Sequence, residues 1–250
     1  MVGSVSLSVS DNIGIIEFHH PKGNSLPSNL LSELAETITK ASSNHEIITL
    51  VLKSSGTGAF CAGASFDELS EIDSPEKGTS FFSGFANVIL AMKNCPKFII
   101  CRVQGKAVGG GVGIIAASDY AIARSKASIK LSELNLGIGP FVIAPVVERK
   151  IGLSALSSLS INSSNWRDAK WAFEKGLYND IYESIDLLDQ SIENLAKHLS
   201  QSSPEAMKTL KSVLWEGSDS LGKVLKERAK LSGKLAQSKF TKEFIEQFKS

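Results

Sequence analysis

The chain has 250 residues, with little excess charge and no long uninterrupted apolar run. Its formal net charge is +1, which gives no electrostatic footprint for nucleic acid. The longest apolar stretch, residues 107–117, contains four glycines and is too short to cross a bilayer. We therefore expect neither a nucleic-acid partner nor a membrane partner.

Cysteine is scarce, and the usual signatures of metal sites and phosphate loops are missing. The three cysteines, Cys61, Cys95 and Cys101, are odd in number and lie in apolar surroundings, which predicts reduced thiols in the core. The four histidines lack metal-ligand spacing, and no phosphate-binding GxxxxGK[ST] loop occurs. Residues 1–12 lack a basic start and an apolar signal core, so we expect a cytoplasmic protein.

Alternating strand-like and helix-like patterns predict an α/β fold with a helical C-terminal part. Residues 4–9 and 13–19 alternate polar and apolar side chains, as in a hairpin. Residues 28–41 have helical spacing with Ser28 as N-cap. The other expected elements are buried strands at residues 47–53 and 97–103, a short strand at 120–123, and helices at 81–92 and 221–248.

Two segments of small residues each follow an apolar strand and open onto a predicted helix. They are FCAGA at residues 60–64 and AVGGG at residues 107–111. Backbone N–H groups at such turns are free, and small side chains let a ligand atom approach them. Two such donors suit an oxygen that gains negative charge during a reaction, such as a thioester oxygen becoming an enolate.

Glu133 is the only carboxylate from residue 125 to residue 147. A carboxyl group placed beside an activated thioester could remove a proton from the neighbouring carbon or return it. The alternative is a solvated glutamate at a helix start. The cluster Phe81, Phe82 and Phe85 lies between the two small-residue segments, and it is either core or the wall of an acyl pocket.

FCAGASFDEL and VQGKAVGGGVGIIAASDYAIA resemble the paired signature of the enoyl-CoA hydratase/isomerase (crotonase) superfamily. GNSL at residues 23–26, SIKLSELNLG at residues 128–137 and the stretch at residues 166–178 resemble three further family segments. Each motif alone is weak. Five in the right order extend the resemblance over nearly the whole chain.

The resemblance implies a right-handed spiral of ββα units, a crotonase-like core, over residues 1–190. A C-terminal helical region at residues 191–250 would then complete the CoA site and form a homotrimer or a dimer of trimers. Coenzyme A is part of the substrate. No metal or other cofactor is expected, because fixed backbone dipoles stabilise the enolate.

The resemblance also implies a role for individual residues. The Ala64 and Gly110 amides correspond to the family's oxyanion hole, and Glu133 corresponds to its catalytic acid/base. The positions expected to bind substrate or CoA are Leu26, Ala62, Ser65, Phe66, Phe244 and Lys249.

One position departs from the hydratases of this family. They carry a second glutamate three residues after the middle glycine, where this chain has Gly113 and no carboxylate from residue 105 to 118. Asp67 and Glu68 are the nearest candidates to replace it. One glutamate suffices for a 1,3-proton shift, so we expect isomerisation of an enoyl-CoA. Hydration of an enoyl-CoA, including the methylglutaconyl type, is the alternative.

Two other hypotheses belong to different functional classes. The first is a catalytically weak CoA-thioester-binding or assembly protein that lost its chemistry with the second glutamate. The second rests on GVGIIA at residues 111–116, which formally satisfies the GxGxxG/A dinucleotide fingerprint. That fingerprint belongs at the first strand–helix crossing of a domain, whereas here more than a hundred residues precede it.

Overall fold

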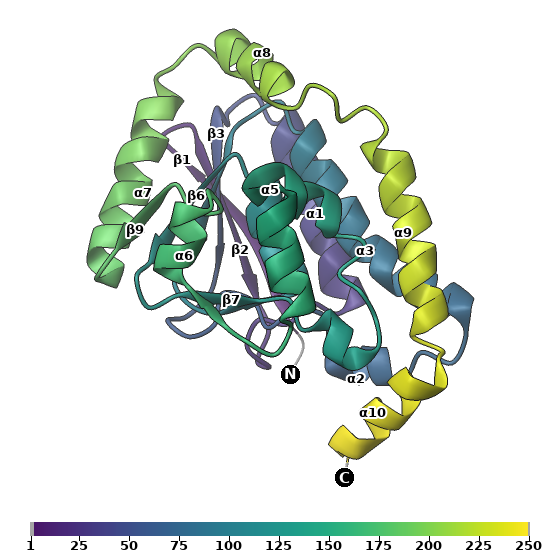
Figure 1. The fold of residues 1–250 in the computed structure, drawn as a ribbon. Coiled ribbons are helices and arrows are strands. Elements are labelled where there is room, and N and C mark those ends of the chain that lie inside the picture. The colour runs from purple at the N-terminus through teal and green to yellow at the C-terminus, as the bar shows by residue number, and fades with distance from the viewer. Residues whose placement is uncertain (1–2, 250) are drawn as a thin grey trace.

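The computed structural model describes residues 3–249, with side chains up to residue 247. Within this range the strands form a six-stranded and a three-stranded sheet (Figure 1). The larger has the order β1-β2-β3-β4-β6-β9, antiparallel between β1 and β2 and parallel elsewhere. Its strands are β1 (Ser4–Ser10), β2 (Ile13–His19), β3 (Thr49–Ser54), β4 (Ile99–Val103), β6 (Tyr120–Arg124) and β9 (Asp180–Tyr182). The smaller contains β5 (Ala107–Val108), β7 (Ser128–Lys130) and β8 (Arg167–Asp168).

The chain passes repeatedly from the larger sheet to the smaller sheet and then into a helix. One turn runs from β4 through β5 into α4 (Gly110–Ala117). The next runs from β6 through β7 into η1 (Glu133–Leu136) and α5 (Ala144–Ile161). An earlier turn leaves β3, forms a bridge at Cys61, and enters α2 (Phe66–Ser70) and α3 (Pro75–Asn94). This arrangement is the predicted ββα spiral.

Helices cover both faces of the larger sheet (Figure 1). The main core draws on α1 (Ser28–Ser43), α3, α4 and α5. On the other face, α7 (Ile185–Ser200) packs Leu188, Ile192 and Ala196 against the sheet. The short α6 (Ala169–Glu174) connects β8 to β9. The expected division between residues 190 and 191 falls inside α7, a helix that packs on the spiral core.

The last three helices wrap around the core (Figure 1). They are α8 (Pro204–Leu214), α9 (Leu221–Leu235) and α10 (Lys239–Lys249). Gly78 of α3 meets Gly233 of α9 so closely that a Cβ at Gly78 would lie 2.7 Å from the Gly233 Cα. Within residues 3–249, no helix combines the length and the apolar character needed to span a bilayer.

The structure corrects several predicted boundaries. The helix predicted at residues 221–248 is divided into α9 and α10. The helix predicted at residues 81–92 begins at Pro75, because the Ser74 side chain accepts a hydrogen bond from the Lys77 N–H at 3.2 Å. Ser28 is not the N-cap of α1, since Pro27 occupies that position and makes no side-chain cap bond.

Candidate active site

Three chain segments from successive turns of the spiral lie side by side. The Val108 N–H donates to the Cys61 carbonyl at 2.9 Å, and the Gly109 N–H donates to the Lys130 carbonyl at 2.9 Å. Cys61 forms a parallel bridge with Ala107. Because Ala64 and Gly110 each follow that bridge by three residues, both lie where their segments leave the smaller sheet. Pairing of β5 with β7 brings the segment that carries Glu133 to the same edge.

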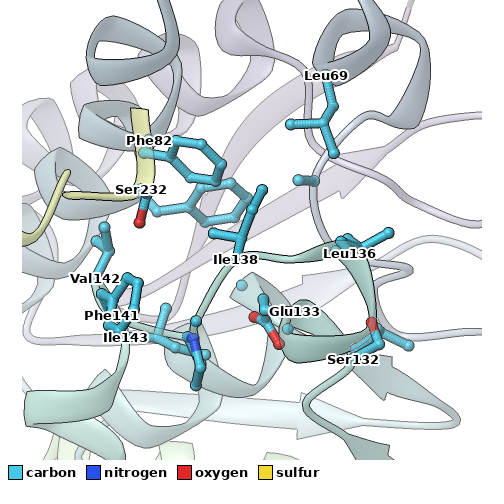
Figure 2. Close-up of a pocket in the computed structure, with 18 of the residues that line it drawn as sticks. Leu69, Phe82, Ser132, Glu133, Leu136, Ile138, Phe141, Val142, Ile143 and Ser232 are labelled. Carbon is cyan, nitrogen blue, oxygen red and sulfur yellow. The ribbon is translucent and has the colours of Figure 1, made fainter. Parts of the chain in front are cut away.

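A cavity of about 460 Å³ opens at this edge, and Ala64, Gly110 and Glu133 all line it. Within the described chain, neither the Ala64 nor the Gly110 amide donates to a backbone acceptor. Gly110 begins α4, so its N–H has no acceptor in a preceding helical turn. The predicted oxyanion donors and the predicted acid/base thus share one cavity. Its apolar wall includes Leu69, Phe82, Leu136, Ile138, Phe141, Val142 and Ile143 (Figure 2).

Glycine is required where two of these segments approach each other. Gly109 has φ +50°, and a Cβ there would lie 2.7 Å from Glu133 Oε1. Gly63 has φ +91°, and a Cβ there would lie 3.0 Å from the Val108 carbonyl oxygen. A side chain at Gly109 would therefore displace the carboxylate as well as strain the backbone.

Glu133 starts η1 and lines the cavity (Figure 2). The Glu133 Oε2 atom is buried and has no hydrogen-bond partner within the described residues. Burial raises the pKa of Glu133 from 4.5 to about 7. A carboxyl group with this pKa exists in both forms near neutral pH, which suits a group that accepts and returns a proton. The alternative of a solvated glutamate does not fit a buried Oε2.

No second carboxylate lines this cavity in the described chain. The ionisable side chains on its wall are Glu133 and Lys130. Asp67 instead forms an ion pair with Lys22 at the surface. The Glu68 carboxylate accepts the Ser28 N–H at 2.7 Å and the Ser28 hydroxyl, so it caps the start of α1. Neither acid replaces the glutamate that is missing at position 113.

The space beside Gly113 is filled by Ile143, the N-cap residue of α5. A Cβ at Gly113 would lie 2.3 Å from Ile143 Cγ2 and 2.7 Å from Ile143 Cβ. Ile143 is itself 3% exposed and lines the cavity. A glutamate at position 113 could enter only if Ile143 moved.

Gly113→Ala is therefore expected to lower the free energy of unfolding by about 1–3 kcal/mol, as overpacking of a filled core does. Denaturant titration measures this loss. Ile143→Ala should remove the 2.3 Å contact with Cγ2 while keeping the Cβ, so adding Gly113→Ala to it should cost less than in the wild-type background. Equal costs in the two backgrounds would show that Ile143 does not close this space.

The predicted substrate-binding positions divide into two groups. Ala62, Phe66 and Phe244 line the cavity. Leu26 is fully buried and does not line it; its N–H donates to the Gly63 carbonyl at 2.8 Å. Leu26 therefore holds the turn that presents the Ala64 amide.

Two further positions have other surroundings. Ser65 is the N-cap of α2, accepts the Glu68 N–H at 3.4 Å, and is not among the residues that line the cavity. Lys249 ends α10, and its side chain lies outside the described part of the chain. A role for Lys249 in CoA binding stays a prediction.

The sequence did not single out the contribution of α9 to this cavity. Ser232 of α9 lines it together with Phe82 and Phe85 of α3. These two members of the phenylalanine cluster are therefore part of the cavity wall. Phe81 lies in a separate small core cluster with Leu69 and Ile138. A lone serine in an amphipathic helix carries no sequence signal for a binding site.

Comparison with known proteins identifies the family and the fold. A sequence model of the family described as enoyl-CoA hydratase/isomerase matches residues 8–250. The probable enoyl-CoA hydratase of Bacillus subtilis (strain 168) is 27% identical over 255 residues, which cover 99% of this chain and 96% of that protein. The mitochondrial methylglutaconyl-CoA hydratase of Homo sapiens is 31% identical over 198 residues, covering 78% of this chain and 58% of that protein.

Solved structures show the same fold. The enoyl-CoA hydratase from Bacillus halodurans has a TM-score of 0.90 at 21% identity, covering 97% of this chain and 99% of that one. An enoyl-CoA hydratase/isomerase from Xanthobacter autotrophicus Py2 has a TM-score of 0.89 at 19% identity, covering 98% and 92%. The family match extends over almost the whole sequence, and the fold is that of the solved structures. The chain therefore belongs to the enoyl-CoA hydratase/isomerase (crotonase) superfamily.

Proposed function

We propose that this protein is an enoyl-CoA isomerase, which moves a double bond from the 3,4 position to the 2,3 position of an acyl-CoA thioester. The observation that carries the proposal is that Glu133 is the one carboxylate lining the cavity in the described chain, on the same cavity as Ala64 and Gly110. A 1,3-proton shift needs one group that removes a proton and returns it.

The reaction begins with the thioester oxygen accepting hydrogen bonds from the Ala64 and Gly110 amides. Ionised Glu133 takes a proton from C2, and the electron pair of that C–H bond is delocalised over the thioester as a dienolate. Protonated Glu133 then gives the proton to C4. The double bond lies between C2 and C3 in the product, and the carboxylate is regenerated.

Burial of the carboxyl group supports both halves of this cycle. The pKa of about 7 makes Glu133 a stronger base than a solvated glutamate. Oε2 is buried and has no hydrogen-bond partner within the described residues, so no side chain competes for a proton on that oxygen.

Hydration of an enoyl-CoA is the second candidate, because the Bacillus subtilis and human relatives are named as hydratases. It requires a water molecule held by something other than a second carboxylate. Ser132 and Asn135 are the polar side chains nearest to Glu133 in sequence on the cavity wall. Asn135 is already bonded to Ser163, whose hydroxyl donates to Asn135 Oδ1 at 2.6 Å.

Single turnover of a 3-enoyl-CoA carrying deuterium at C2 tests the proposal. We expect a conjugated 2-enoyl product with part of the deuterium transferred to C4, because one carboxyl group carries it between the two carbons. Conjugated product with no transferred deuterium, even at short reaction times, would contradict a single shuttling group. A protein that binds CoA esters without turning them over would give no conjugated product at all.

The pH dependence of kcat/KM should report the ionisation of Glu133 in the free enzyme. Because the ionised carboxylate is the base, kcat/KM is expected to rise with pH and to level off above about 7. Initial rates of conjugation between pH 5 and pH 9 measure the profile. A profile that is already flat at pH 5 would mean that the acting base has an ordinary carboxyl pKa.

We also propose that the protein assembles as a homotrimer or a dimer of trimers, acts in the cytoplasm and needs no cofactor beyond the CoA of its substrate. The basis for the assembly is the family resemblance. Mass measurement in solution tests the assembly, and turnover after exhaustive dialysis against a chelator tests the independence from metal.

A further inference from the structure

Ser232 is a polar side chain on an otherwise apolar part of the cavity wall. It belongs to α9, is 1% exposed, and lines the same cavity as Glu133. Figure 2 shows Ser232 near Phe82 and Val142, on the side of the cavity away from Ser132. An acyl chain that reaches this side of the cavity would therefore meet Ser232.

The Ser232 hydroxyl makes no hydrogen bond within the described residues, whereas comparable buried hydroxyls do. Ser118 Oγ donates to the Ile115 carbonyl at 2.7 Å, and Ser83 Oγ donates to the Thr79 carbonyl at 2.6 Å. Alanine would be a better helix former at this position. The hydroxyl is thus available to an atom that enters the cavity.

The charge around Ser232 indicates which kind of atom fits. Arg228 lies one helical turn earlier on α9 but does not line the cavity, and its Nη1 donates to the Phe141 carbonyl at 3.4 Å. The neighbouring wall consists of Phe82, Phe141 and Val142. A carboxylate placed beside these three side chains would lose its hydration, and none of the three would supply a cation in return, which is costly. A neutral oxygen would lose less and would gain the hydrogen bond from Ser232.

We propose that Ser232 is a specificity-determining residue that binds a hydroxyl or keto oxygen on the acyl chain, remote from the thioester. The substrate class is accordingly an enoyl-CoA with an oxygenated acyl tail. This inference rests on the proposed function for the position of the thioester, at Ala64 and Gly110. It does not depend on which reaction Glu133 performs.

Calorimetric titration with saturated acyl-CoA esters tests the inference, because these esters bind without being turned over. Hexanoyl-CoA and octanoyl-CoA are each compared with analogues that carry a keto or hydroxyl group near the chain end. Wild-type protein is expected to bind at least one oxygenated ester more tightly than the plain ester of equal length. Ser232→Ala should weaken that oxygenated ester about tenfold, as loss of one hydrogen bond does. It should leave the plain esters unchanged or tighter.

Ser232→Thr keeps the hydroxyl and is expected to retain the preference. Ser212→Ala, on the exposed surface of α8, is the matched control and should change neither affinity. Equal loss for plain and oxygenated esters in Ser232→Ala would overturn the inference. Tightest binding by adipoyl-CoA, which ends in a carboxylate, would also overturn it. Failure of the isomerase proposal would instead leave this preference intact while no double bond moved.

Discussion

Replacing Glu133 with glutamine is expected to lower turnover of the true substrate by at least about 10²-fold, in the range for removal of a general acid/base. The amide keeps the size of the side chain but cannot accept or return a proton. No other carboxylate among the described residues lines the cavity to take over the role. Steady-state rates on a 3-enoyl-CoA measure the loss, and titration with a saturated acyl-CoA should show little change in affinity.

Two controls separate lost chemistry from lost structure. Glu71→Gln changes an exposed carboxylate at the C-cap of α2 and should leave turnover unchanged.

Glu133→Gln should also make the protein more stable than the wild type above pH 7. The pKa of Glu133 is raised from 4.5 to about 7 on folding, so the native state binds more protons than the unfolded state between these values. The free energy of unfolding of the wild type therefore falls across that window by roughly 3 kcal/mol. Near-normal turnover of a folded Glu133→Gln variant would place the chemistry elsewhere.

Lys211→Met is expected to lower the free energy of unfolding by about 3–5 kcal/mol, the range for removing one partner of a buried ion pair. The side chains of Lys211 and Asp119 are 3% and 6% exposed and lie 2.8 Å apart. Lys211 Nζ also donates to the Met92 carbonyl at 3.0 Å and the Lys97 carbonyl at 2.9 Å. Methionine fills similar space but leaves Asp119 without this cation. Denaturant titration measures the change.

Lys208→Met on the same helix is the matched control, because Lys208 is exposed. It should change the unfolding free energy by less than about 0.5 kcal/mol, as surface substitutions do. A similarly small change for Lys211→Met would mean that α8 does not depend on the buried pair. Double replacement of Lys211 and Asp119 by apolar residues should recover part of the loss, since no charge is then left unpaired.

The parts of the site that the sequence could predict are those encoded locally. The turns at Ala64 and Gly110 are recognisable because small residues follow apolar strands, and both lie on the cavity as expected. Glu133 stands out because its segment contains no other acid. These features depend on a few adjacent residues, which is why a linear reading finds them.

Features created by contacts between distant segments could not be predicted. Ser28 has the composition of an N-cap, but the cap of α1 is supplied by the carboxylate of Glu68, forty residues further on. The sequence around Lys211 is typical of a solvent-exposed lysine on an amphipathic helix, yet its side chain is buried against Asp119. Ser232 becomes part of the cavity only because α9 folds back over α3.

The sequence shows that a carboxylate is missing at position 113, and this alone leaves open whether a substitution could restore it. The structure shows Ile143 in the space that a side chain would need. A one-glutamate site is therefore built into the packing of α4 against α5.

The measurement that tests this account most directly is the ratio of two wild-type rates in water labelled with oxygen-18. A 3-enoyl-CoA and the 2-enoyl-CoA of equal chain length are supplied separately. Absorbance reports the position of the double bond, and mass spectrometry reports the incorporation of oxygen. We predict that the 3-enoyl double bond moves faster than water adds to the 2-enoyl ester, with little labelled oxygen in either product. Rapid hydration of a 2-enoyl-CoA, with labelled oxygen in the product, would contradict it.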